Sequence, residues 1–320
     1  MATGSGQHGT GRPSALAFAP ASVGNVAVGF DVLGHSVSVM GDRVRAARMP
    51  DRSVRISGIT GVVRDLPLDP ARNTAGRAVM ALADALQLDY GFDLIIDKGI
   101  PLASGLGGSA ASAVAAVVAA NALLEEPVDP LQLLKFAMAG EAVSSGTPHA
   151  DNIAASLYGG LVLTVGLDDP VVVRIPVPQV IRCVLVHPHL ELATHEARDM
   201  LARAVSLSDF VSQQGNLAGF VAGCFTEDLR LIRTSLADVV IEPQRKRLIP
   251  GFDAVKQAAL AAGALGCSIS GAGPAVFAWC EAPGVDAVSR GMTDAFRAHG
   301  IAADVWVTAI DATGAHVEPT

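Results

Sequence analysis

A glycine-rich loop that leads into a helix-forming stretch is the segment of this 320-residue chain best suited to chemistry. It reads Pro101-Leu102-Ala103-Ser104-Gly105-Leu106-Gly107-Gly108-Ser109-Ala110-Ala111. Glycines let the backbone approach an anion closely, and the free N–H groups and dipole of a helix N-terminus attract negative charge. The loop therefore indicates phosphate binding, with the Ser109 hydroxyl available to a phosphate or to its metal ion.

Other interpretations of the loop fit the sequence less well. Gly105, Gly107 and Ala110 match the dinucleotide pattern G-x-G-x-x-A, and Glu125 lies near the expected distance, but the βαβ fold needs a strand before Glu125 and none is predicted. A Walker loop needs Gly-Lys-[Ser/Thr], and this loop has no lysine. A tight glycine turn that binds nothing stays open on the residues alone.

The elements that must position these residues mix strands and helices. Asn73 or Thr74 is the predicted N-cap of a helix over residues 75–88, and the apolar run 110–124 predicts a buried helix too short to span a bilayer. We expect a further helix over residues 130–143 and another that follows the polar, turn-rich segment 144–152. Two helical regions are expected between 194 and 236, and the last helices over 252–262 and 285–299. Predicted strands cover residues 16–20, 36–39, 54–56, 92–96, 161–165, 171–175, 181–186, 267–269, 275–280 and 303–309.

The composition excludes several classes of protein. Half of the residues are hydrophobic, only 17% are charged and the net charge is −8, so no broad basic surface is expected for a nucleic acid or an anionic membrane. Cys183, Cys224, Cys267 and Cys280 show no metal-ligand spacing and are expected to be packing residues. Residues 1–13 are expected to form a flexible lead without a signal-peptide pattern, which predicts a cytoplasmic protein.

Two motifs resemble the GHMP kinases. Residues 101–111 resemble their phosphate loop, with a departure at Gly108, where the family usually has a serine; residues 268–277, Ser-Ile-Ser-Gly-Ala-Gly-Pro-Ala-Val-Phe, resemble their C-terminal glycine motif. The resemblance implies an α+β fold of two domains, S5-like over residues 14–170 and ferredoxin-like over 171–320. The pattern of predicted elements places a soft boundary near residue 170, where Asp168-Asp169-Pro170 interrupts it. The resemblance also implies ATP as phosphate donor, bound by residues 101–111 and Asn73.

Four further segments resemble the homoserine kinases among them, so the likeness runs from about residue 14 to 310. They are residues 20–34, 140–152, 194–198 and 242–252. The resemblance implies that L-homoserine is bound by Asn25, Asp31, His149, Thr194, Arg198 and Arg245. A carboxylate such as Asp31 suits an ammonium group, with turn capping as the lesser alternative, and a guanidinium suits a carboxylate. His149 could be a metal ligand, but no second His or Cys lies at ligand spacing, and Lys246 and Arg247 are expected to be solvated helix charges.

The same resemblance implies the chemistry. Ser109 and Glu141 would hold Mg²⁺ through oxygen, as a hard cation requires. Asn152 would orient the acceptor hydroxyl and Asp151 would support its geometry, giving O-phospho-L-homoserine on the route to threonine, in a homodimer. Two rivals remain: another GHMP kinase, acting on a mevalonate derivative or a sugar, needs no ammonium partner at Asp31, and a non-catalytic nucleotide-binding regulator needs neither Ser109 nor Glu141.

Overall fold

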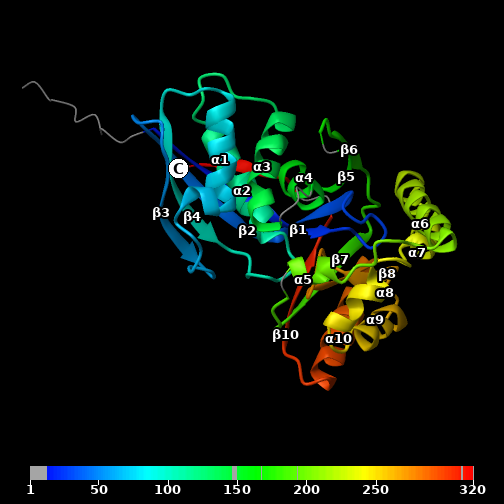
Figure 1. The fold of residues 1–320 in the computed structure, drawn as a ribbon. Coiled ribbons are helices and arrows are strands. Elements are labelled where there is room, and N and C mark those ends of the chain that lie inside the picture. Colours follow the sequence, from blue (N-terminus) through cyan, green and yellow to red (C-terminus); the bar gives the residue numbers. More distant parts are fainter. Residues whose placement is uncertain (1–12, 146–149, 167, 193, 311–312, 320) are drawn as a thin grey trace, which may run out of the picture.

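The computed structural model describes residues 13–145, 150–166, 168–192, 194–310 and 313–319. The described chain forms two units, each a sheet with its own helices, and the two units pack against each other (Figure 1). The first and the last described strands both belong to the first sheet, so the described part of the chain begins and ends in the same half of the molecule.

The first sheet has seven strands, with β1 and β2 at its centre. Its order is β11-β1-β2-β4-β3, while β5 pairs with β2 and β6 pairs with β5. Only β3 and β4 run parallel among these pairs. The strands are β1 Ser14–Gly24, β2 Leu33–Met49, β3 Val54–Gly61, β4 Gly91–Lys98, β5 Leu161–Val165, β6 Val171–Ile175 and β11 His316–Glu318.

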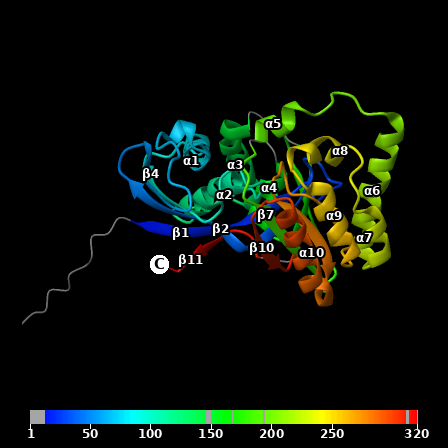
Figure 2. The ribbon, with the colours of Figure 1, turned by 90° about the horizontal axis from the view of Figure 1, so that it is seen from below.

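Four helices gather on one face of this sheet, as Figure 2 shows. They are α1 Thr74–Ala85, α2 Gly108–Asn121, α3 Pro130–Ser145 and α4 Ala150–Tyr158. The central helix α2 packs on β1 and β2 and on the other three helices, so it is buried from Ala110 to Ala120 on all sides. Its alanines allow this close approach from every direction, and that explains why its sequence shows no apolar stripe.

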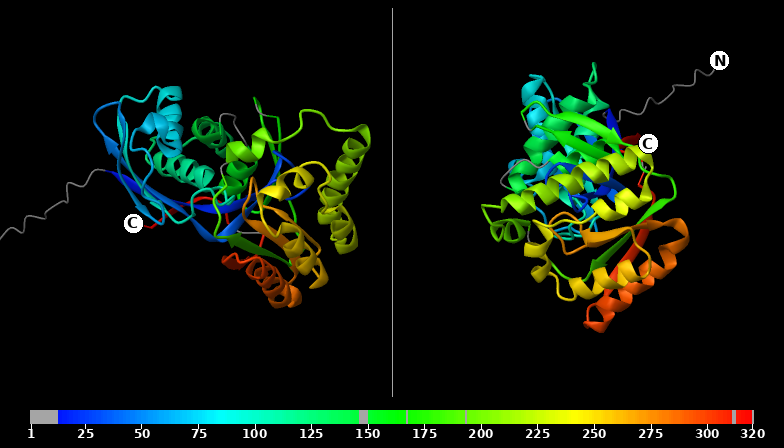
Figure 3. Two further views of the ribbon diagram at one scale, coloured as in Figure 1. Left: turned by 60° about the horizontal axis from the view of Figure 1, so that its bottom comes forward. Right: turned by 90° about the vertical axis from the view of Figure 1, so that its right-hand side faces the viewer.

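The second sheet separates two cores. Its strands β7 Ile181–Pro188, β8 Gly266–Ile269, β9 Val276–Glu281 and β10 Ala303–Thr308 lie in the antiparallel order β10-β7-β9-β8. Side chains alternate along β7: Val184 faces the core under α9 Phe252–Ala261 and α10 Val285–Ala298, whereas Leu185 faces the core of the first unit. Figure 3 shows α9 and α10 on the outer side of this sheet.

A buried polar contact joins the two units. The indole Nε1 of Trp279 on β9 donates to Nε2 of His35 on β2 at 3.3 Å, and His35 Nδ1 lies 3.0 Å from the Ser36 carbonyl oxygen. Burial lowers the pKa of His35 to about 4, so the imidazole is neutral at physiological pH. A neutral ring with its proton on Nδ1 satisfies both contacts, which fixes the tautomer.

The remaining elements lie in the connections between the strands. They are the helices α5 Thr194–Asp199, α6 Leu207–Thr226, α7 Leu229–Ser235 and α8 Glu242–Arg245, and the 3₁₀ turns η1 Pro70–Arg72, η2 Lys246–Leu248 and η3 Ala282–Gly284. Among the described helices, none is long and apolar enough to cross a membrane. All four cysteines are buried and free, which confirms their predicted packing role.

The sequence placed most elements correctly and misjudged several boundaries. The strand predicted over residues 36–39 is far longer, because the polar residues after it pair within the sheet instead of ending the strand. The region 194–236 holds three helices rather than two, and α8 and β11 were not predicted. The first sheet continues past residue 170 to Ile175, because β6 pairs with β5, and β11 returns to pair with β1. Of the expected flexible lead, only Pro13 is among the described residues.

Candidate active site

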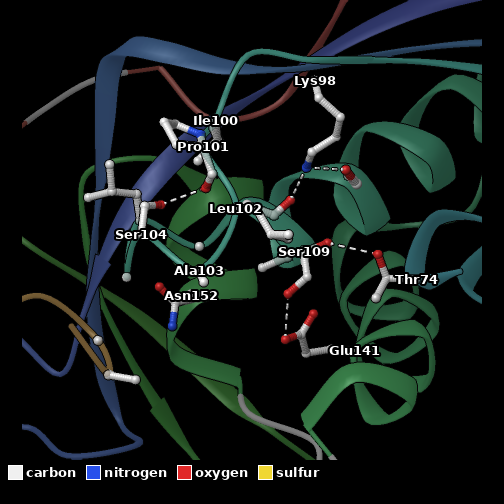
Figure 4. Close-up of a pocket in the computed structure, with 18 of the residues that line it drawn as sticks. Thr74, Lys98, Ile100, Pro101, Leu102, Ala103, Ser104, Ser109, Glu141 and Asn152 are labelled. Atoms are coloured by element: carbon white, nitrogen blue, oxygen red, sulfur yellow. Dashed lines mark hydrogen bonds between the residues drawn. The ribbon is translucent and has the colours of Figure 1, made fainter. Parts of the chain in front are cut away.

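A pocket of about 340 Å³ lies where the two units meet, and it collects most of the predicted site residues. Residues 101–110 of the glycine-rich loop form one wall (Figure 4). The other lining residues with predicted roles are Asn25, Asp31, Asn73, Glu141, Asp151, Asn152, Arg198 and Arg245. The predicted residue Ala111 lies one position beyond the lining segment and is fully buried in α2.

Two glycines of the loop, Gly105 and Gly107, have no room for a side chain. Gly105 and Gly107 have φ of 77° and 68°, the left-handed region, and Gly107 is the N-cap of α2 without any side-chain cap. A Cβ on Gly105 would lie 2.6 Å from the Ser270 carbonyl oxygen, and one on Gly107 would lie 2.2 Å from Ser22 Oγ. The loop therefore needs glycine at both positions, and its helix N-terminus faces the pocket.

The two glycine motifs of the sequence meet at this loop. Ser270 Oγ donates to the Gly105 carbonyl at 2.7 Å, and the Ala275 N–H donates to the Ser104 carbonyl at 3.1 Å. The second motif comes from the connection between β8 and β9, so the second sheet supports the glycine-rich loop of the first. A single backbone platform thus forms from segments about 165 residues apart.

A buried ion pair that the sequence did not reveal lies beneath the start of α2. Lys98, at the end of β4, contacts Asp42 of β2 in a salt bridge and donates to the Gly108 carbonyl at 2.7 Å and to Ser112 Oγ at 2.8 Å (Figure 4). Asp42 in turn accepts from Ser112 Oγ at 2.6 Å and from the Gly99 N–H at 3.0 Å. Both charged side chains are almost fully buried, so this network fixes the first turn of α2 from below.

Two oxygen donors stand beside the same helix terminus. Ser109 Oγ donates to Glu141 Oε1 at 2.8 Å, and Thr74 Oγ1 donates to the Ser109 carbonyl at 3.2 Å. Asn73 caps α1, as predicted, through Oδ1 and donates through Nδ2 to the Pro67 carbonyl at 3.0 Å. Its side chain is committed to these bonds, so Asn73 shapes the wall of the pocket by holding α1 and its entry loop.

The turn between β1 and β2 carries Asn25 and Asp31 in a strained backbone conformation. Asn25, Val26 and Ala27 have φ of 67°, 43° and 58°, and Asp31 has φ of 61°. Left-handed non-glycine residues cost about 1–3 kcal/mol each and persist only where the surroundings hold them. The Asn25 side chain supplies part of this support: Nδ2 donates to the Gly271 carbonyl at 2.9 Å, and Oδ1 accepts from the Asp31 N–H at 3.0 Å.

Two guanidinium groups face this turn. Arg198 of α5 forms a salt bridge to Asp31 at 2.7 Å, with both side chains about one-third exposed. Arg245, at the end of α8, is buried and donates to the carbonyl oxygens of Ala197 at 2.9 Å and of Gly271 at 3.1 Å. Both guanidinium carbons lie over the Phe30 ring, at 5.5 Å and 5.2 Å from its centroid. The pocket therefore has one end rich in charge and another rich in free N–H groups.

Asp151 and Asn152 lie between these two ends. The segment expected to be a turn is helical here, because both residues sit in the first turn of α4, where polar residues are favoured. Asp151 Oδ2 accepts from the Asn25 N–H at 3.2 Å, and Asn152 Oδ1 accepts from Ser22 Oγ at 2.8 Å. Burial, and then the nearby Asp31 charge, raise the pKa of Asp151 to about 6.

The structure brings together all predicted site residues whose side chains it describes, apart from the buried Ala111. His149 lies outside the described residues, and Thr194 opens α5 but its side chain is not among those described. Sequence reasoning missed Asp42, Lys98, Ser22 and Thr74. A lysine three residues before the loop, just after the predicted strand 92–96, was the available signal for Lys98; its partner could not be found without the strand pairing.

Comparisons of the sequence and of the fold with known proteins point to the same family. The family model for the N-terminal domain of GHMP kinases matches residues 73–160, and that for the C-terminal domain matches residues 217–298. The homoserine kinase of Xylella fastidiosa (strain M12) is 48% identical over 98% of this chain and 97% of its own length, and that of Xanthomonas campestris pv. campestris (strain B100) is 50% identical over 96% and 95%. The crystal structure of homoserine kinase from Cytophaga hutchinsonii has a TM-score of 0.91 at 42% identity, covering 99% of this chain and 100% of that one.

The buried ion pair gives a first testable prediction. Asp42→Asn leaves the Lys98 ammonium buried without its counter-charge, so we expect a loss of about 3–5 kcal/mol in the free energy of unfolding, measured by urea denaturation. Asp169→Asn is the control, because it breaks the exposed pair between Lys135 and Asp169, 3.2 Å apart, and should leave stability unchanged. Equal losses in the two variants would refute a special role for the buried pair.

The raised pKa of Asp151 predicts a pH-dependent stability. The folded protein holds this proton more tightly than the unfolded chain, so the contribution of Asp151 is favourable at low pH and declines as pH rises from about 4 to about 6. Relative to Asp151→Asn, which does not titrate at this position, the free energy of unfolding of the wild-type protein should fall by up to about 3 kcal/mol across this window. Thermal unfolding of both proteins from pH 4 to 7 measures the difference, and a constant difference would contradict the prediction.

Proposed function

The chain belongs to the homoserine kinase family of the GHMP kinases, and we propose that its pocket transfers the terminal phosphoryl group of ATP to the side-chain hydroxyl of L-homoserine. The observation that carries this proposal is the division of one pocket into an anion-binding helix terminus and a cluster of paired carboxylates and guanidinium groups. The product, O-phospho-L-homoserine, lies on the route to threonine.

The helix terminus suits the phosphates of ATP. The free N–H groups at the start of α2 and the close backbone of residues 105–108 attract a polyphosphate, and the buried Lys98 network keeps them in place. Phosphoryl transfer asks a protein chiefly to hold donor and acceptor in line and to neutralise charge. A rigid, positively polarised loop meets this requirement better than a reactive side chain would.

Ser109 and Glu141 fit a magnesium site. Both offer hard oxygen atoms, 2.8 Å apart at the helix terminus, and Mg²⁺ commonly binds few protein oxygens while it keeps waters and phosphate oxygens. Within the described residues, no group of three or more His, Cys, Asp and Glu side chains could hold a metal ion. Ser109 and Glu141 would hold Mg²⁺, which would supply positive charge to neutralise the polyphosphate.

The charged end of the pocket suits an amino acid. The α-carboxylate of homoserine would bind the guanidinium groups of Arg198 and Arg245, and its ammonium group would bind the Asp31 carboxylate. Asn25 would hold the turn that presents Asp31. His149 and Thr194 are proposed substrate contacts on the family resemblance. A mevalonate derivative or a sugar carries no ammonium group and would leave Asp31 without this ligand.

Asn152 is proposed to orient the acceptor hydroxyl. It lies in the pocket wall, and its amide is itself oriented by Ser22 Oγ. Asp151 is largely ionised at pH 7, and it accepts hydrogen bonds from the Asn25 N–H and from Asn152 Nδ2, at 3.2 Å and 3.3 Å. Its proposed part is therefore to fix Asn25 and Asn152, and the transfer needs no strong base.

The cellular setting is also a proposal. We infer a cytoplasmic enzyme that works as a homodimer, on the family resemblance. Exposed apolar side chains on α6, Leu207, Phe210 and Val211, offer the kind of surface that a subunit contact would bury.

A substrate panel tests the proposed function. Release of ADP from ATP, followed in a coupled assay, should be at least about 10²-fold faster with L-homoserine than with mevalonate, galactose or shikimate, because only homoserine satisfies both charges of the pocket. Removal of divalent metal by EDTA should abolish turnover, and Mg²⁺ should restore it. No turnover with homoserine would overturn the proposal, and ADP release with none of the four would favour a nucleotide-binding regulator.

The roles within the acceptor site give a further prediction. Asn152→Ala should lower kcat by about 10²-fold at little cost in KM for ATP, because it removes the group that aligns the hydroxyl. Ser22→Ala leaves Asn152 in place but removes the hydrogen bond that orients its amide, so the decrease in kcat should be smaller. The kcat of Asp151→Ala, compared with that of Asn152→Ala, shows which of the two residues matters more for transfer. Unchanged turnover in Asn152→Ala would show that the assignment is wrong.

A further inference from the structure

One glutamine connects the two halves of the amino-acid end of the pocket. Gln213 lies on α6, outside the pocket, and its amide makes two hydrogen bonds of opposite sense. Nε2 donates to the Val28 carbonyl at 3.1 Å, and Oε1 accepts from the Val239 N–H at 3.0 Å. Because one partner is an acceptor and the other a donor, a single orientation of the amide satisfies both.

The first partner belongs to the strained turn. Val28 is buried and follows the three left-handed residues that begin at Asn25, and Asp31 lies three residues further on. Two hydrogen bonds inside the turn, from Val28 N–H to the Val26 carbonyl and from Gly29 N–H to the Asn25 carbonyl, are both 2.8 Å long. Such a conformation persists only where outside contacts hold it, and Gln213 supplies one from the second half of the chain.

The second partner belongs to the segment that presents Arg245. Val239 follows Asp238, whose carboxylate accepts from the N–H groups of Val240, Ile241 and Glu242 at 2.9, 3.0 and 2.7 Å. These bonds open α8, a helix of only four residues that ends at Arg245. A helix this short has little stability of its own, so the position of the guanidinium depends on how the preceding segment is held.

We propose that Gln213 is a positioning residue that sets the separation between the ammonium site at Asp31 and the carboxylate site at Arg245. This inference rests on the proposed function, since the ammonium and carboxylate groups of homoserine are bonded to the same carbon and so have a fixed separation. The amide ties the two backbone segments to one rigid helix, and neither of its hydrogen bonds touches the nucleotide end of the pocket. Gln213 therefore acts on recognition of the amino acid and not on binding of ATP.

Steady-state kinetics of Gln213→Met test the inference. Methionine keeps the length of the side chain and loses both hydrogen bonds, and each bond is worth about a three- to tenfold change in an equilibrium constant. We expect KM for L-homoserine to rise about tenfold, KM for ATP to stay within about twofold, and the preference for L- over D-homoserine to fall. Gln213→Glu retains the acceptor for Val239 but places a carboxylate against the Val28 carbonyl, so it should not restore the wild-type KM.

The neighbouring Gln214 provides a matched control. It is the same residue type on the same helix but is exposed, so Gln214→Met should leave both KM values and the melting temperature unchanged. An unchanged homoserine KM in Gln213→Met would overturn the inference while the kinase activity stands. Equal rises in the two KM values with a lower melting temperature would show a merely structural role and also overturn it. Failure of the wild-type protein to turn over homoserine would instead refute the proposed function, and this inference with it.

Discussion

The first turn of α2 must keep its N–H groups free and pointing into the pocket, and this constraint organises the residues around it. A side chain cannot cap the turn from the front without blocking the anion site, so support comes from other directions. Lys98 and Asp42 hold it from below, Thr74 holds the Ser109 carbonyl, and the second glycine turn holds Gly105. The costs of a buried ion pair and of left-handed glycines are both consequences of keeping one helix terminus open.

The acceptor end is organised by charge balance. Two carboxylates, Asp31 and Asp151, face two guanidinium groups, Arg198 and Arg245, so the cluster carries no net charge when all four are ionised. Burial, and then the nearby Asp31 charge, raise the pKa of Asp151, while Arg198 forms a salt bridge to Asp31. A ligand that is itself a zwitterion can join this cluster without disturbing its balance, whereas an acid or a neutral sugar leaves some of the charges without a ligand.

The sequence revealed those parts of the site that depend on local backbone chemistry. The glycine loop, the Asn73 cap and the buried alanine helix follow from short-range rules and could be read directly. The ion pair of Lys98 with Asp42 could not, because it depends on the pairing of β2 with β4 across 56 residues. The length of β2 was missed for a related reason: its charged residues find partners such as Glu318 only after the C-terminal strand has joined the sheet. The contacts of Gln213 could not be predicted from the sequence, because both of its hydrogen-bond partners are backbone groups.

The chain passes between the two sheets twice, from β6 to β7 and again from β10 to β11. Since the pocket takes its walls from both units, with Gly105 on one side and Arg245 on the other, each crossing ties together the two parts that form it. The return of a three-residue strand, β11, to the first sheet means that separation of the units would have to break its pairing with β1 as well as the packing of Leu185 into the first core.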